Sequence, residues 1–282
     1  MAILNQKPNI SFLQNSLFSL VLLFSIPSQA DELRIVSLSP AITEVLFDLG
    51  LQKNIVGTSS FSNYPEEAKK IPSVGSYLSP SIEKIIRLNP THVLAFKEGD
   101  PSIGESLDKA KLNTIVLESR SLDDFENMLK ELGALFKVEK KSQEIISLWK
   151  TQWSKLENVP RSKEKLMIQV DQSPIYIAGN DTFISRAFEK CGFRNTFDNL
   201  DGYKKIQLEA VMNRKPEIIL VVGMIDQSGN FNTVKEFWKS NPVTKNARII
   251  QGDGDILSRL SPRFPKEVIK ICSQLKPLKA AE

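Results

Sequence analysis

After the first thirty residues, short β-rich runs alternate with stretches in which apolar residues recur at helical spacing. The first of these are a strand at 34–39, a helix that ends at Gly50, and a strand at 54–60. Ser39 and Pro40 fit the start of that helix, because Ser is a good N-cap and Pro is favoured at the first helical position. Strands that alternate with helices predict a parallel sheet covered on both faces, and so an α/β fold.

The same pattern predicts the remaining elements along the chain. Helices are expected at 81–88, 102–111, 121–136, 182–191, 208–214, 232–239 and 261–275, and strands at 91–96, 113–118, 165–171, 175–178, 217–222 and 247–252.

One of these helix–strand units occurs twice. Residues 82–96 read IEKIIRLNPTHVLAF, and residues 208–222 read LEAVMNRKPEIILVV. In each copy an acidic residue, Glu83 or Glu209, opens an amphipathic helix, and a turn with Pro leads into an apolar strand. The copies lie too far apart for a solenoid, whose repeats span about 20–50 residues. They predict two similar α/β lobes with something shared between them.

A long helical stretch without Gly or Pro, residues 139–157, separates the two copies. Trp149 and Trp153 lie on one apolar stripe of this stretch. They could stack on a ligand, but packing in the core or between the lobes is the favoured interpretation. The predicted organisation is therefore a lobe, a rigid helix and a second lobe, with boundaries at 31–138, 139–160 and 161–282.

The first thirty residues differ in kind from the rest. Lys7 supplies a weakly basic start, residues 12–26 are mostly apolar, and Ser28-Gln29-Ala30 fits the small-x-small rule for signal cleavage. A retained membrane anchor is the alternative, but the apolar run is short for a spanning helix of about 20 residues. Residue 31 is Asp rather than Cys, which argues against a lipoprotein. We expect a cleaved signal peptide and a free periplasmic protein.

Composition and charge exclude some functions. The 282 residues are 41% hydrophobic and 25% charged, as in a soluble globular protein with a real core. The net charge of +4 is too mild and too evenly spread to indicate a nucleic-acid partner. Cys191 and Cys272 are the only cysteines. Export permits a disulfide between them, and two separate buried thiols are the alternative.

Enzyme signatures are scarce. The chain has no HExxH, GxSxG or Walker motif, and Gly252-Asp253-Gly254 is an incomplete glycine motif that we interpret as a loop. His92, the only histidine, falls inside a predicted strand, where a structural role is favoured over catalysis or metal binding. Asp253 and Asp255 could act as paired carboxylates in acid–base chemistry, although a solvated loop is favoured. We expect no resident metal and no cofactor.

Aromatic residues recur at loop positions after strands or before helices. Ligands of open α/β folds bind near the carboxyl ends of the strands, so rings from two lobes would form a flat-walled apolar cleft for a large ring-bearing ligand. Tyr77 and Tyr203 each stand six residues before a repeated glutamate. The candidate set is Phe61, Tyr77, Phe96, Tyr176 and Tyr203.

Glu83 and Glu209 allow two interpretations. An acidic residue in the first turn of a helix is favoured by the helix dipole alone. Two such residues at equivalent places in two lobes could instead dock onto basic residues of a partner.

The chain resembles a known family, the periplasmic binding proteins of cobalamin, siderophore and haem importers. Within that family it resembles the cobalamin binders most. The likeness covers nearly the whole chain after residue 30. It rests on the segments RIVSLSPAITEVLFDLG, VGTSSFSNYPEEAKKIPSVGSY, SIEKIIRLNPTHVLAF and SRLSPR. The resemblance implies two Rossmann-like lobes joined by one long rigid helix.

The resemblance also implies roles for individual residues. The five aromatic positions would line a corrinoid cleft, with Asp255 and Arg259 on its rim. Glu83 and Glu209 would engage arginines of the membrane permease, and Cys191 and Cys272 would form a disulfide. The chain departs from the family pattern in two respects: several cleft positions that are Trp in relatives are Tyr or Phe here, and an acidic rim position is Ser258.

These observations predict a monomeric solute-binding protein that captures a corrinoid and delivers it to the permease of an ABC importer. The first alternative is an iron-siderophore or haem binder on the same fold. An anionic iron chelate favours several cations, of which only Arg259 is well placed, whereas Tyr77 or Tyr203 could ligate haem iron. The second alternative is a periplasmic enzyme that uses Asp253 and Asp255.

Overall fold

The computed structural model describes residues 32–97, 101–157, 159–160, 162–223 and 231–275. The expected signal peptide lies outside the described residues. We call the described residues up to α4 the N-terminal half and those from β7 onward the C-terminal half. Among the described residues, no helix combines the length and the apolar character needed to cross a bilayer.

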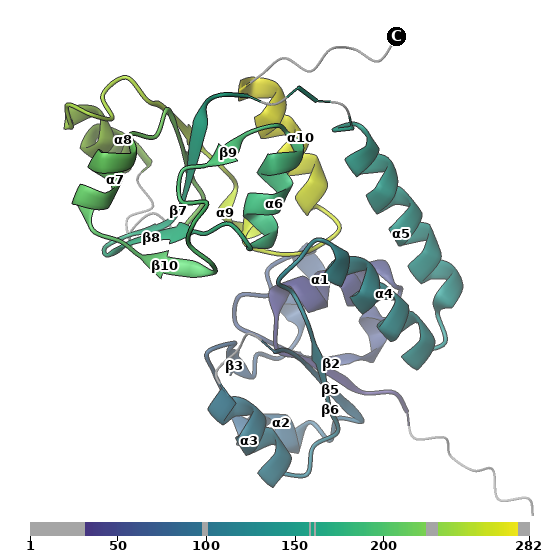
Figure 1. The fold of residues 1–282 in the computed structure, drawn as a ribbon. Coiled ribbons are helices and arrows are strands. Elements are labelled where there is room, and N and C mark those ends of the chain that lie inside the picture. Colours follow the sequence, from purple (N-terminus) through teal and green to yellow (C-terminus); the bar gives the residue numbers. More distant parts are fainter. Residues whose placement is uncertain (1–31, 98–100, 158, 161, 224–230, 276–282) are drawn as a thin grey trace, which may run out of the picture. The chain divides into compact units, whose positions relative to one another are not determined.

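The N-terminal half is built on a four-stranded, fully parallel sheet in the order β2-β1-β5-β6. Helices α1 and α4 cover one face of this sheet, and α2 and α3 cover the other (Figure 1). Side chains of alternate residues leave the two faces, so that Ile35 packs with α1 and α4 while Val36 packs with α2 and α3. This confirms the predicted parallel sheet with two covered faces. The elements are β1 (Ile35–Ser37), α1 (Pro40–Asp48), β2 (Ile55–Thr58), β3 (Gly75–Ser76), β4 (Ser79–Pro80), α2 (Ile82–Arg87), β5 (His92–Phe96), α3 (Pro101–Lys109), β6 (Thr114–Leu117) and α4 (Asp123–Leu135).

Helix α5 (Glu139–Ser154) follows in the chain between the two sheets. Both of its tryptophans are buried, Trp149 at 4% and Trp153 at 9% exposure. Trp149 stacks on Phe125 of α4, and Trp153 lies 6.0 Å from the ring of Phe264 in α10. The tryptophans are therefore core residues, as the favoured interpretation predicted.

The C-terminal half contains a mixed sheet in the order β10-β8-β7-β11-β12, with β9 paired to β7. Helices α7 and α8 cover one face and α6 and α10 the other (Figure 1). The elements are β7 (Lys165–Gln172), β8 (Ile175–Ala178), α6 (Phe183–Lys190), β9 (Arg194–Asn195), β10 (Tyr203–Lys205), α7 (Leu208–Arg214), β11 (Ile218–Val221), α8 (Phe231–Ser240), β12 (Arg248–Gln251), α9 (Gly254–Leu257) and α10 (Phe264–Leu275).

The sheet of this half is mixed rather than fully parallel. Strand β8 runs antiparallel to β7, and β10 antiparallel to β8. Only Ser173 and Pro174 separate β7 from β8. A connection this short can make a hairpin but cannot make the crossover that parallel strands need.

The repeated unit is confirmed in three dimensions. Glu83 and Glu209 lie in the first turns of α2 and α7, and each helix leads through a Pro turn into a central strand, β5 or β11. The turns match in detail, because Asn89 (φ 43°) and Lys215 (φ 54°) both adopt left-handed backbone one position before the Pro. A left-handed residue is a common way to end a helix.

A disulfide joins Cys191, directly after α6, to Cys272 in α10, with Cα atoms 6.0 Å apart. Both cysteines are buried at 1% exposure. The two helices that cover one face of the second sheet are thereby linked covalently, and the alternative of two separate thiols is excluded.

Candidate functional site

A cavity of about 1530 Å³ is lined by residues from both halves. Its walls include residues at or just beyond the carboxyl ends of β1, β5, β7, β11 and β12. This is where open α/β sheets bind ligands. The volume exceeds the roughly 300–1,000 Å³ typical of sites for drug-sized molecules, so the cavity has room for a bulky ligand.

Four of the five candidate aromatic residues line this cavity: Phe61, Tyr77, Phe96 and Tyr203. Phe61, Tyr77 and Tyr203 are 41%, 49% and 48% exposed, and Phe96 is half-buried. Phe61 and Tyr77 meet edge to face, with ring centroids 6.2 Å apart. Large rings left open at the wall of a cavity provide apolar surface for a ligand to cover.

The fifth candidate, Tyr176, is not among the cavity-lining residues. It lies in β8, where its neighbours Ile175 and Ile177 pack into the core under α7 and α8. Because side chains alternate along a strand, Tyr176 leaves the other face, and in the ladder it is paired with Lys205 of β10. The structure therefore does not bring Tyr176 together with the other four rings.

Glycines make the cavity floor possible where β7, β11 and β12 end. A Cβ on Gly223 would collide with the carbonyl oxygen of Val170, and one on Gly254 would collide with that of Val222. The backbone segments therefore pack closely where these strands end.

The segment that starts at Gly252 is not the loop that we expected. Asp253 is the N-cap of the short helix α9, and its carboxylate accepts a hydrogen bond from the backbone N–H of Ile256 at 3.2 Å. This helix has four residues, which is too short for its period to appear in the sequence. Asp255 accepts from Arg259 at 2.9 Å and from Asn63 at 2.8 Å. Asp253 thus caps a helix, and Asp255 forms an ion pair with Arg259.

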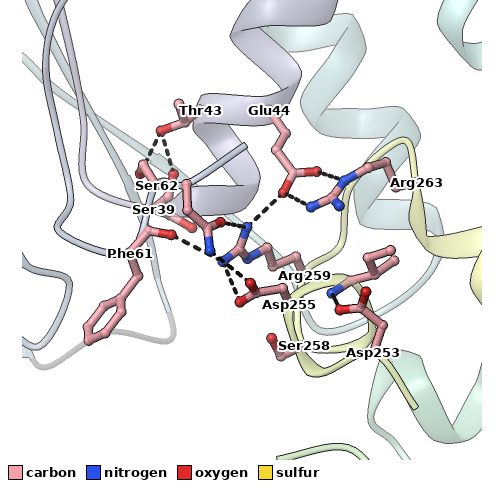
Figure 2. A network of polar contacts seen from close by, with 12 residues as sticks. Ser39, Thr43, Glu44, Phe61, Ser62, Asp253, Asp255, Ser258, Arg259 and Arg263 are labelled. Atoms are coloured by element: carbon pink, nitrogen blue, oxygen red, sulfur yellow. Dashed lines mark hydrogen bonds and ion pairs between the residues drawn. The ribbon is translucent and has the colours of Figure 1, made fainter. Parts of the chain in front are cut away.

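A buried ionic network lies beside the cavity (Figure 2). Glu44 of α1, only 2% exposed, accepts hydrogen bonds from Arg259 at 3.0 Å and from Arg263 at 2.6 and 2.9 Å. Burial of a carboxylate is tolerated when it is paired and its oxygens are satisfied. Two guanidinium groups meet that condition here.

The predicted rim residue Arg259 is itself 6% exposed. Besides Glu44 and Asp255, its guanidinium donates to the side-chain oxygen of Asn63 at 2.8 Å and to the carbonyl of Phe61 at 3.1 Å. Most of its hydrogen-bonding capacity is therefore used within the protein.

Sequence reasoning missed Glu44 and Arg263. No local signal marks Glu44, because at helical spacing it falls on the side of α1 opposite Ile42 and close to Asp48, where an acidic residue is ordinary. Its two partners lie more than two hundred positions along the chain, so their identity was not available from local sequence.

A second polar cluster borders the cavity at Tyr203. Burial opposes ionisation of Asp181, but hydrogen bonds from the backbone N–H of Gly202 and from Arg120 outweigh it and lower the pKa of Asp181. Desolvation and, after it, the negative charge of Asp181 raise the pKa of Tyr203. Tyr203 is 48% exposed and lines the cavity, and the raised pKa keeps its phenol in the neutral form.

The charges of the described cavity wall are balanced. Lys97, Arg120, Arg259 and Lys270 line the cavity, and each pairs with a carboxylate: respectively Glu118, Asp181, Asp255 and Glu267. Such a wall presents little net charge to a ligand.

Glu83 and Glu209 are both exposed, away from the cavity lining. Glu83 has an 84% exposed side chain and only a 3.7 Å contact with Arg87. Both carboxylates are free to contact another molecule.

His92 is structural, as expected. Its Nδ1 lies 3.0 Å from the hydroxyl of Thr91, its ring meets Phe136 edge to face, and burial lowers its pKa. Among the residues that the structure describes, no group of three or more His, Cys, Asp or Glu side chains could hold a metal ion.

Comparisons with known proteins agree with this geometry. A family model described as "Periplasmic binding protein" matches residues 35–253. The chain is 30% identical over 262 residues to a vitamin B12-binding protein of Yersinia pestis, an alignment that covers 91% of this chain and 90% of that protein.

Solved structures show the same fold. A periplasmic heme-binding protein from Pseudomonas aeruginosa matches with a TM-score of 0.77 at 22% identity, covering 88% of this chain and 94% of that one. A periplasmic vitamin B12-binding protein of Vibrio cholerae matches with a TM-score of 0.74, also at 22% identity, covering 88% and 98%.

The family consists of binding proteins rather than enzymes, so the enzyme alternative built on Asp253 and Asp255 is not retained. The family match spans both sheets and the helix between them, and it includes most of the cavity wall. This chain belongs to the periplasmic binding protein family.

Proposed function

We propose that this chain is the solute-binding protein of an ABC importer and that it captures a corrinoid and delivers it to a permease. The observation that carries the proposal is the cavity, which is large, walled by open aromatic rings and balanced in charge. Flat apolar walls suit a bulky ring-bearing ligand. The name of the Yersinia relative, a vitamin B12-binding protein, supports the same ligand.

In this proposal, Phe61, Tyr77, Phe96 and Tyr203 contact the ligand. Asp255, whose side chain is 48% exposed, is a polar contact at the rim, and Arg259 holds that carboxylate in place. We leave Tyr176 out of the ligand-binding set because it does not line the cavity.

Glu83 and Glu209 are proposed to dock onto basic residues of the permease. This docking role is supported by the equivalent positions of the two residues. Each is an exposed acid in the first turn of the repeated helix, one in each half. Exposed complementary charges set the orientation and the rate of association more than the affinity for a third molecule.

Export completes the proposal. Residues 1–30 act as a cleaved signal peptide, and the mature chain works in the periplasm as a monomer. We further propose that it consists of lobes at 31–138 and 161–282 joined by a linker at 139–160, since α5 packs on helices of both halves.

Haem is the stronger alternative ligand, because a solved structure with this fold is a heme-binding protein and two tyrosines line the cavity. Tyrosine ligates haem iron through its oxygen, preferably as phenolate. The raised pKa of Tyr203 disfavours that form. An anionic iron-siderophore is disfavoured for another reason, because the cavity-lining cations are already paired.

The test is calorimetric titration of residues 31–282 with cyanocobalamin, haemin and a ferric siderophore. We expect one cyanocobalamin per chain and no saturable binding of the other two. Tyr77→Ala should weaken cyanocobalamin binding roughly tenfold, about 1.4 kcal/mol, whereas Tyr176→Ala should leave it unchanged. Saturable haemin binding without cyanocobalamin binding would replace the proposed ligand by haem and leave the family intact.

A further inference from the structure

The ionic network of Glu44, Arg259 and Arg263 connects the two halves. Glu44 lies in α1, directly after the first strand of the N-terminal half, and both arginines follow α9 in the C-terminal half. Arg263 donates to both oxygens of the Glu44 carboxylate, through Nε and Nη2. Arg259 donates to Oε1, the same oxygen that accepts from Nη2 of Arg263 (Figure 2). Two-donor pairs of this kind fix geometry as well as charge.

The same arginines hold the segment that carries Phe61. Arg259 donates to the Phe61 carbonyl and to Asn63, and Asn63 donates back to Asp255. The guanidinium of Arg263 lies over the ring of Tyr64, 3.8 Å from its centroid. Segment 61–64, which provides one aromatic wall of the cavity, is thus attached to the opposite half by several polar contacts.

Glu44 does not line the cavity, yet it is the anion on which both arginines converge. Without its charge, Arg259 would keep Asp255 as its carboxylate partner, whereas Arg263 would lose both of its hydrogen bonds to Glu44. Removing one partner of a buried pair leaves an uncompensated charge and is strongly destabilising.

We propose that Glu44 is a positioning residue for the binding site. Its bridge to Arg259 and Arg263 holds the halves at the separation that places Phe61 opposite the C-terminal wall of the cavity. Loss of the bridge lets the halves separate and shortens the lifetime of the bound ligand. The statement about ligand lifetime rests on the proposed function, whereas the statement about separation does not.

The experiment measures both quantities. Spin labels are placed on exposed helices of the two halves through Lys84→Cys and Lys235→Cys, and their distance distribution is recorded without ligand. Glu44→Gln keeps the size of the side chain and should lengthen and broaden the distribution. Dissociation of cyanocobalamin should become on the order of tenfold faster. Adding Arg263→Gln to Glu44→Gln removes the uncompensated cation without restoring the bridge, so the distribution should remain longer and broader than that of wild type.

The matched control is Glu164→Gln, which removes an equally charged partner from Arg248 within the C-terminal half and should leave the distance unchanged. If Glu44→Gln does not fold, Asn63→Ala removes the two side-chain contacts of Asn63 across the halves, with Arg259 and with Asp255, without leaving a buried charge, and it should still broaden the distribution. Wild-type distances in the ligand-free Glu44→Gln and Asn63→Ala proteins would overturn the inference. A changed distance with no cyanocobalamin binding in any variant would retain the bridge and reject the proposed ligand.

Discussion

The indole rings of Trp149 and Trp153 meet edge to face on one stripe of α5, with centroids 5.5 Å apart. One ring packs against the N-terminal half and the other against the C-terminal half. Trp149 stacks on Phe125 of the N-terminal half, with centroids 3.9 Å apart, and Trp153 packs near Phe264 of the C-terminal half. Helix α5 therefore contributes to the core of both halves. A connection anchored in this way restricts hinge motion more than a flexible linker would.

Replacing Trp149 should be strongly destabilising. Trp149→Ala removes a buried ring from the contact between α4 and α5, and such truncations cost about 3–5 kcal/mol in the free energy of unfolding. Urea unfolding followed by circular dichroism measures the loss. Leu148→Ala, at a neighbouring position that is 65% exposed, should stay within about 0.5 kcal/mol of wild type. A similar loss in both variants would contradict the anchoring role of Trp149.

The disulfide should stabilise the fold without affecting the site. Cys191 and Cys272 are 81 positions apart, and chain-entropy estimates for such a loop are on the order of 4.5 kcal/mol. Cys191→Ser with Cys272→Ser should therefore lower the urea midpoint, and reductant should do the same to wild type only. Neither cysteine lines the cavity, so ligand affinity in the folded double variant should be unchanged. A fall in affinity at full foldedness would show that the disulfide shapes the site.

Removing the two repeated glutamates should separate transport from binding. Glu83→Ala with Glu209→Ala should abolish corrinoid uptake in cells that depend on this protein, because the permease loses both charged contacts. Calorimetry should show unchanged ligand affinity, since neither residue lines the cavity. The control, Glu66→Ala with Glu236→Ala, removes the same charge from other exposed positions and should transport normally. Equal loss of affinity and uptake in the first variant would reject the docking role.

The single histidine allows a direct test of the linkage between protonation and folding stability. Burial lowers the pKa of His92 below the ordinary histidine value of 6.5, so near and below that pH the unfolded chain binds more protons than the folded one. Its contribution to stability should therefore be present at neutral pH and decline as pH falls through 6.5 toward the folded pKa. One imidazole signal in an NMR titration reports that pKa. His92→Gln should flatten the pH dependence of unfolding in this window, and an NMR pKa above 6.5 would contradict the sign.

Much of the fold was predictable because its signals are local. Period-3.6 and continuous apolar runs identified α4, α5, β5 and β11, and the repeated Glu–helix–Pro–strand unit identified two halves. Short elements escaped prediction. Helix α9 has four residues, too few for a helical period to appear in the sequence, and the antiparallel position of β10 follows from its pairing with β8.

The candidate site was predicted in part for the same reason. The position of a ring after a strand is a local feature, and it correctly suggested four of the cavity-lining rings. Tyr176 has the same local appearance, but the alternation of side chains along β8 directs it elsewhere. The roles of Arg259 and Glu44 could not be predicted from the sequence. The residues around an arginine in the sequence do not show whether its side chain faces a ligand or a buried carboxylate.

By itself, the sequence determined the type and order of most of the secondary structure, the duplication of an α/β unit and the balance of charge. These depend on periodicity and composition, which every short window of the chain carries. Only the tertiary structure decided which rings share a cavity and which charges pair across the halves. Those outcomes depend on contacts between residues more than two hundred positions apart. The energies of these contacts are set by burial and distance, which exist only once the chain has folded.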